Sequence, residues 1–207
     1  MRNERIFAAN KTHENMKSPD EIAKIKAVLL YILKSNGGVQ DFVSLVKKMY
    51  FAQQEYLVTY GRPLCNDSFY ARDRGPVPSF TYKSLWAEFE NKSCSSEIQD
   101  FNKSFSVSIS GKSRNIKALE DPDMDELAVA EVEMLDVVLE RLKGLTAEQL
   151  TDMSRQDKAW KDAYEQTEDD PERGLMSIMS IARSGGAKKP MLDYIRESLQ
   201  FEAWCRS

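Results

Sequence analysis

The fold of this chain depends most on residues 49–78, which have the sequence MYFAQQEYLVTYGRPLCNDSFYARDRGPVP. They predict the end of an amphipathic helix, a stop at Gly61, an extended segment and a rigid GPVP corner before a second helix. Gly61 suits the stop because glycine adopts the left-handed C-cap conformation without steric cost. The two prolines of the corner cannot donate to a β-ladder, so we expect any strand over 68–72 to end before it.

Two helices are predicted upstream of this corner. Ser18 suits an N-cap, Pro19 the first helical position and Glu21 the third, which completes a capping box. Asn and two glycines at 36–38 end that helix, and a second helix runs from about 40 to 60 with apolar residues at helical spacing. Phe51 and Leu57 widen the apolar surface, so we expect this second helix to be covered on two sides and central to the core.

A small sheet is predicted in the middle of the chain. Serines alternate with apolar residues over 104–110, which is the period of a half-buried strand, and a return strand follows over 116–120. The strand at 68–72 is the candidate for a third member of this sheet. The polar residues 91–100 are expected to form a connector.

The second half of the chain has mainly helical signals. A helix with one acidic face is expected over 124–142, and a capping box opens the next helix at Thr146. The predicted fold class is mainly α with a small antiparallel β-sheet (α+β), a helical domain with a two- to three-stranded sheet. The expected organisation is an N-terminal arm (1–18), a main domain (19–165) and a C-terminal helical extension packed on the same domain (166–207).

Composition narrows the possible classes of function. The 207 residues carry a net charge of −4, and no basic cluster is denser than two adjacent lysines, whereas nucleic-acid binders usually show a basic stripe. A basic protein is therefore a more suitable partner for this acidic chain than a nucleic acid. Three scattered cysteines fit a reducing cytoplasm, and no apolar run approaches the ~20 residues that span a bilayer. We expect a cytoplasmic protein that does not bind membranes.

No catalytic, metal or cofactor site is predicted. His13 is the only histidine and has no candidate partner for metal binding or catalysis. Asp121, Asp123 and Asp125 alternate as in a calcium loop, but Glu126 replaces the loop glycine and Val132 its last acid. The sequence therefore indicates a protein that is not an enzyme and needs no cofactor.

Two surfaces are candidates for partner recognition. Asp73 and Arg74 flank the GPVP corner and place a charged pair on a rigid loop, although the corner alone also suits a purely architectural role. The stretch 120–140 is rich in acids and holds no basic residue, which favours either solubility or electrostatic steering of a basic partner.

The joint pattern of this chain resembles the Panacea domain, also described as the SocA-type antitoxin domain. The resemblance covers about 20–165. It differs where the family often has a serine, at Ala128, and where a histidine often follows 150–154. The matching motifs are YFAQ (50–53), YGRPL (60–64), DRGPVPS (73–79), IKALEDPDMDEL (116–127), LTDMS (150–154) and AW (159–160).

The resemblance implies an antitoxin of a two-gene toxin–antitoxin pair that neutralises its toxin by direct protein–protein binding. Members act on unrelated toxins, one branch delivers its toxin to a ClpXP-type AAA+ protease, and related domains occur in phage and prophage genes. A DNA-binding, winged-helix-like regulator stays open because of the first helical pair. The expected contact residues are Arg62, Asp73, Arg74, Pro76, Pro78, Tyr82, Glu131, Glu133 and Asp136.

Overall fold

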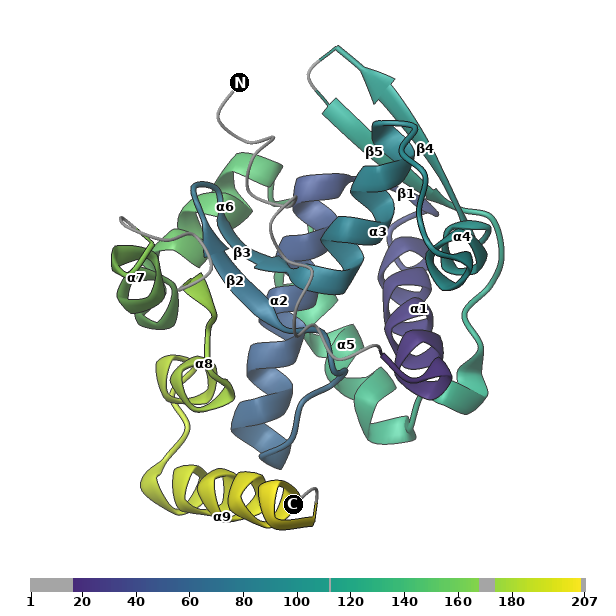
Figure 1. The fold of residues 1–207 in the computed structure, drawn as a ribbon. Coiled ribbons are helices and arrows are strands. Elements are labelled where there is room, and N and C mark those ends of the chain that lie inside the picture. The colour runs from purple at the N-terminus through teal and green to yellow at the C-terminus, as the bar shows by residue number, and fades with distance from the viewer. Residues whose placement is uncertain (1–16, 112, 168–173, 206–207) are drawn as a thin grey trace.

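Helix α2 (Phe42–Tyr60) lies at the centre of the molecule, and other helices and two small sheets surround it (Figure 1). The computed structural model describes residues 17–111, 113–167 and 174–205. In α2, Met49, Tyr50, Tyr56 and Leu57 are fully buried. The prediction of a central helix covered on two sides is therefore confirmed.

Eight further α-helices and one short 3-10 helix lie within the described residues, so the predicted α+β class is confirmed. The helices are α1 (Pro19–Lys34), α3 (Ser79–Phe89), α4 (Ser96–Asn102), η1 (Met124–Glu126), α5 (Val129–Arg141), α6 (Ala147–Gln156), α7 (Lys158–Glu165), α8 (Ile178–Ser184) and α9 (Lys189–Cys205).

The strands form two separate antiparallel sheets. The first has the order β1-β5-β4 and contains the predicted hairpin, in which Val107 pairs with Ile116. The second is the hairpin β2-β3. The strands are β1 (Val39–Asp41), β2 (Phe69–Arg72), β3 (Gly75–Pro78), β4 (Phe105–Ser110) and β5 (Ser113–Ala118).

The predicted helix boundaries around α1 and α2 are confirmed by hydrogen bonds. The Ser18 hydroxyl accepts from the Glu21 N–H at 3.2 Å, and the Glu21 carboxylate accepts from the Ser18 N–H at 2.8 Å. Gly61 ends α2 in the left-handed conformation with φ 67°. A Cβ at Gly61 would lie 2.5 Å from the Tyr194 ring, so glycine is required there for space as well as for conformation.

The prediction that the prolines end the strand at the GPVP corner is wrong, because these residues form β3. The backbone N–H and C=O groups of residues 75 and 77 point toward β2. The same alternation continues at Ser79, which donates its N–H to the Ser68 carbonyl at 2.8 Å. Pro76 and Pro78 occupy the alternate positions, whose N–H groups would point away from β2. An edge strand tolerates proline at such positions.

Three other local predictions are corrected. The third strand of the hairpin sheet is β1, not 68–72, and its three residues are too few to show an alternating pattern. Residues 91–100 do not form only a connector, since α4 begins at Ser96. The helix expected over 124–142 begins at Val129 after η1, and the Glu131 carboxylate accepts from the Ala128 N–H at 2.8 Å.

A buried carboxylate fixes the start of α3. Asp67 accepts hydrogen bonds from the Phe80 N–H at 2.8 Å, the Thr81 N–H at 2.9 Å and the Thr81 hydroxyl at 2.7 Å. Burial raises the pKa of Asp67 above its usual value, while these hydrogen bonds act in the opposite direction. Because the residue before α3 is Pro78, with no side-chain acceptor, Asp67 supplies the cap from outside the helix.

Helices α8 and α9 follow one another on one side of α2 (Figure 1). Asp157 joins α2, α7 and α8: it caps α7 and accepts hydrogen bonds from Tyr50, Gln54 and Ser184. Ile195 of α9 is buried, whereas Trp204 near its end is exposed. The predicted arm lies outside the described residues up to position 16, and so does His13.

Candidate partner-binding site

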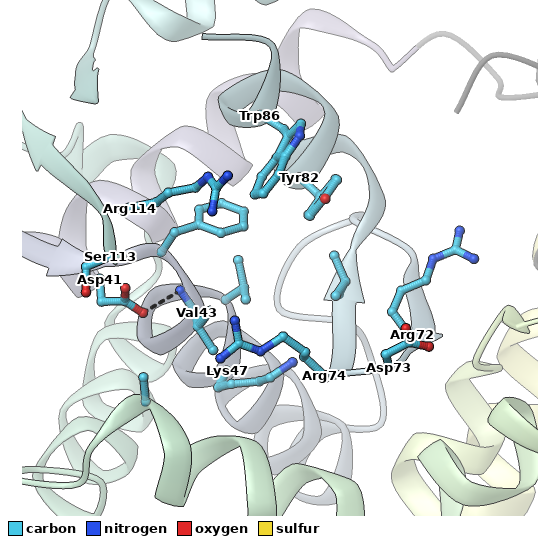
Figure 2. Close-up of a pocket in the computed structure, with 14 residues that line it drawn as sticks. Asp41, Val43, Lys47, Arg72, Asp73, Arg74, Tyr82, Trp86, Ser113 and Arg114 are labelled. Atoms are coloured by element: carbon cyan, nitrogen blue, oxygen red, sulfur yellow. Dashed lines mark hydrogen bonds between the residues drawn. The ribbon is translucent and has the colours of Figure 1, made fainter. Parts of the chain in front are cut away.

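A cavity of about 560 Å³ opens between the start of α2, the β2–β3 turn, α3 and β5 (Figure 2). We call it the arginine pocket because Arg72, Arg74 and Arg114 all line it. The volume falls within the roughly 300–1,000 Å³ of typical ligand sites. The remaining lining residues are Asp41, Phe42, Val43, Val46, Lys47, Asp73, Val77, Tyr82, Trp86, Ser113 and Ala147.

Aromatic side chains form one wall of the arginine pocket. Tyr82 and Trp86, one turn apart on α3, stack with ring centroids 4.9 Å apart and planes within 11°. Phe42 approaches both rings at 5.8 and 6.0 Å. Such pairs contribute beyond their burial, so the wall is held rigidly. Burial raises the pKa of Tyr82 to about 12, and its phenol stays neutral at physiological pH.

Arg114 lies against this aromatic wall. Its guanidinium carbon is 4.4 Å from the centroid of the Trp86 ring, a cation–π geometry. Its Nε is buried and has no hydrogen-bond partner among the described residues. The stacking fixes the plane of the guanidinium while a donor remains unsatisfied, which is an arrangement suited to binding an acceptor from outside the chain.

The β2–β3 turn supplies the opposite rim. Asp73 and Arg74 are both exposed at this turn, and the Tyr164 hydroxyl donates to the Asp73 carboxylate at 2.9 Å. The Trp160 indole N–H donates to the Arg72 carbonyl at 3.1 Å. These two bonds tie the turn to α7, so its charged side chains are presented from a supported loop.

Lys47 lies beneath the turn and is only 1% exposed. Its ammonium donates to the Pro76 carbonyl at 2.6 Å. Burial, with the nearby Arg74 charge, lowers the pKa of Lys47 to about 7. A Cβ at Gly75 would lie 2.5 Å from the Ser154 hydroxyl and 3.0 Å from Lys47 Nζ, so the turn packs tightly on both side chains.

The structure brings only part of the predicted contact set together. Asp73, Arg74 and Tyr82 line the arginine pocket, and Pro76 and Pro78 are buried in the adjacent strand β3.

Arg62 lines a second cavity, of about 610 Å³, between the Gly61 corner and α9. Its guanidinium donates to the Tyr56 hydroxyl at 3.1 Å, so this arginine is anchored to α2. Within the described residues, the two cavities share no lining residue.

The three predicted acids all lie on α5, outside the arginine pocket, and we call this group the acidic face. Glu131 is only 6% exposed, and its carboxylate pairs with the Lys24 ammonium. Asp136 accepts from the Tyr31 hydroxyl at 2.6 Å, and Glu133 is exposed. Glu131 therefore joins α1 to α5, while Glu133 and Asp136 remain accessible.

The part of the chain that the structure describes contains no candidate metal site. No group of three or more His, Cys, Asp or Glu side chains there could hold a metal ion. Asp123, from the calcium-like triplet, accepts from the Asp125 N–H and caps η1. No helix of that same part is long and apolar enough to cross a membrane.

The fold is thus a helical α+β domain with a cationic, aromatic-walled cavity beside a proline-containing hairpin. The chain belongs to the family described as antitoxin SocA-like, Panacea domain, whose model matches residues 45–161, more than half of the chain. No curated protein and no solved structure matches it. The family match includes β2, β3, α3 and β5, which build most of the arginine pocket.

Sequence reasoning missed three central residues of this pocket: Lys47, Trp86 and Arg114. Lys47 was detectable, because a lysine in a helix predicted to be covered on two sides is a candidate for burial. Trp86 follows the apolar spacing of its helix, a pattern that indicates a core residue rather than the wall of a pocket. Arg114 carries no signal in the sequence, since the register of β4 with β5 and the position of α3 bring it to Trp86.

Proposed function

We propose that this protein is the antitoxin of a toxin–antitoxin pair and neutralises its cognate toxin by direct, stoichiometric protein–protein binding. The observation that carries the proposal is the family match over 45–161. A cavity lined by three arginines and a stacked aromatic wall gives such a protein a preformed surface to bind with. In this proposal the protein acts in the cytoplasm, without a membrane, a cofactor or catalysis.

The contact surface we propose begins with the β2–β3 turn and the α3 wall, through Asp73, Arg74 and Tyr82. Pro76 and Pro78 support it from β3 by fixing the backbone of the hairpin edge. Arg62, Glu133 and Asp136 are accessible but lie on other surfaces, and a large toxin would reach them only as additional contacts.

We propose further that 19–165 form the neutralising unit and that the helices after 166 support it. Asp157 joins α2, α7 and α8 through the hydrogen bonds of Tyr50, Gln54 and Ser184. Removal of α8 and α9 would expose the surface of α2 that these helices cover.

Co-expression with the product of the adjacent gene tests the function. We expect that gene alone to stop growth, this chain to restore it, and the two proteins to copurify in a fixed ratio. A non-toxic neighbour, or failure of this chain to restore growth, would contradict the proposal. The assay is then repeated in cells that lack a ClpXP-type protease. If the chain inhibits its toxin by binding, growth is still restored; if it delivers the toxin to proteolysis, growth is no longer restored.

A further inference from the structure

We propose that the arginine pocket binds an acidic segment of a partner protein, with an aspartate or glutamate side chain bound between Arg74 and Arg114. An apolar side chain next to that acid would pack against the floor of the pocket. The inference rests on the proposed function only for the identity of the partner, because the chemistry of the pocket is independent of it.

The charges of the pocket support a carboxylate ligand. Within the described residues, neither Arg74 nor Arg114 forms an ion pair with a carboxylate. The two acids that line the pocket are already engaged: Asp41 accepts from the Val43 N–H at 2.9 Å, and Asp73 accepts from Tyr164. Both acids accept from neutral donors and keep their charge, but three arginines line the cavity against two carboxylates, so the lining carries a net positive charge.

Arg114 provides the most specific observation. Its buried Nε lacks an acceptor among the described residues, and a buried donor left unsatisfied is destabilising. Guanidinium groups bind carboxylates in a planar, two-point geometry. A carboxylate from a partner would supply the acceptor that this donor lacks.

The floor of the pocket supports a neighbouring apolar side chain. Val43 and Val46 come from α2, and Val77 comes from β3. In Figure 2, Arg114 lies beside Tyr82 and Trp86 on one wall, and Arg74 enters from the other wall next to Lys47. A cavity of about 560 Å³ has room for more than the acid alone, so a short peptide segment fits its mixed lining better than a single ion.

A nucleotide fits the pocket less well than a peptide. Arg114 and Tyr82 lie on the two sides of the Trp86 ring, so neither indole face is open for a base (Figure 2). The first amides of α2 would attract a phosphate, but the Asp41 carboxylate already accepts from Val43 and Ser44. That fixed negative charge opposes a phosphate at the same place.

A peptide selection tests the inference without the toxin. A phage-displayed dodecapeptide library is selected on the full chain and counter-selected on the double variant R74E/R114E. One enriched peptide is then synthesised, and its affinity is measured by calorimetry for the wild type, R74E/R114E, the milder R74Q/R114Q and the control R183E. Arg183 is exposed on α8 and does not line the pocket, so R183E reverses a charge elsewhere. Circular dichroism establishes which variants fold.

We expect enriched peptides that combine Asp or Glu with an apolar residue. Their affinity should fall at least tenfold in R74E/R114E and in R74Q/R114Q, and change less than twofold in R183E. Peptides without acids, or equal affinity for the glutamine variant, would overturn the inference. ATP is titrated as a separate probe, and ATP binding that R74Q/R114Q abolishes would overturn the choice of a peptide. If wild type fails to restore growth in co-expression, only the proposed function fails.

Discussion

The arginine pocket and the acidic face differ in how well the sequence shows which charges are free to bind a partner. The acids of 120–140 are conspicuous in the sequence, yet Glu131 is buried and its carboxylate pairs with the Lys24 ammonium. The arginines of the pocket are scattered along the sequence, yet Arg74 and Arg114 meet at one cavity without a carboxylate partner among the described residues. A charged residue is available for recognition only when the fold leaves it unpaired.

The largest effect is expected inside the acidic face. Glu131→Ala removes the partner of Lys24 and the acceptor of the Ala128 N–H. Because breaking a buried ion pair leaves an uncompensated charge, we expect a loss of about 3 kcal/mol in the free energy of unfolding. The measurement is urea denaturation. Glu133→Ala, on the same helix but exposed, should change stability by less than about 0.5 kcal/mol. Equal effects of the two substitutions would contradict the distinction between them.

A smaller effect is expected at the base of the pocket, from the titration of Lys47. Its pKa is about 7 in the folded chain, against an ordinary value of 10.5, so the unfolded chain binds the extra proton between these values. The free energy of unfolding therefore rises with pH in that window, by at most about 1.4 kcal/mol per pH unit. Well below pH 7, Lys47 is protonated in both states and gives no pH dependence.

The comparison with Lys47→Met isolates this contribution because other groups titrate equally in both proteins. We expect the stability of the wild type relative to Lys47→Met to increase by about 2 kcal/mol between pH 7 and pH 9. Lys103→Met, which removes a highly exposed lysine, is the control for the loss of a lysine charge at the surface. A flat difference for Lys47→Met would show that this lysine is not desolvated.

The smallest effect is expected at the aromatic wall. Arg114→Gln removes the cation over Trp86, and cation–π pairs contribute about 1 kcal/mol. A double-mutant cycle with Trp86→Leu, followed by thermal and urea unfolding, measures the coupling between the two side chains. Additive losses would show that the stacking contributes nothing to stability and that Arg114 is not held for binding by this ring.

The sequence predicts those parts of the fold that depend on local chemistry. Ser18 and Glu21 begin a helix through hydrogen bonds of their own side chains, and Gly61 ends one because a residue without a Cβ adopts the left-handed conformation. Strand β3 was missed because the effect of a proline depends on which edge of the strand it faces, and only the pairing with β2 decides that. Strand β1 is too short for any period to appear.

The candidate site was predicted only at the β2–β3 turn and at Tyr82, since those residues lie close together in the sequence. Arg114 reaches the pocket through the register of a distant hairpin, and Lys47 acquires its low pKa through packing under the turn. Such long-range effects have no local signature. The overall net charge of −4 predicts a basic partner, whereas the pocket itself favours an acidic segment.

The most direct test of this account combines the toxin with the pocket in one growth assay. The adjacent gene is expressed alone and with wild type, R74E/R114E or R183E, at equal protein levels verified by immunoblotting. We expect wild type and R183E to restore growth, and R74E/R114E, although folded, not to restore it. Full restoration of growth by R74E/R114E would contradict the assignment of the pocket, and no restoration by wild type would contradict the antitoxin function itself.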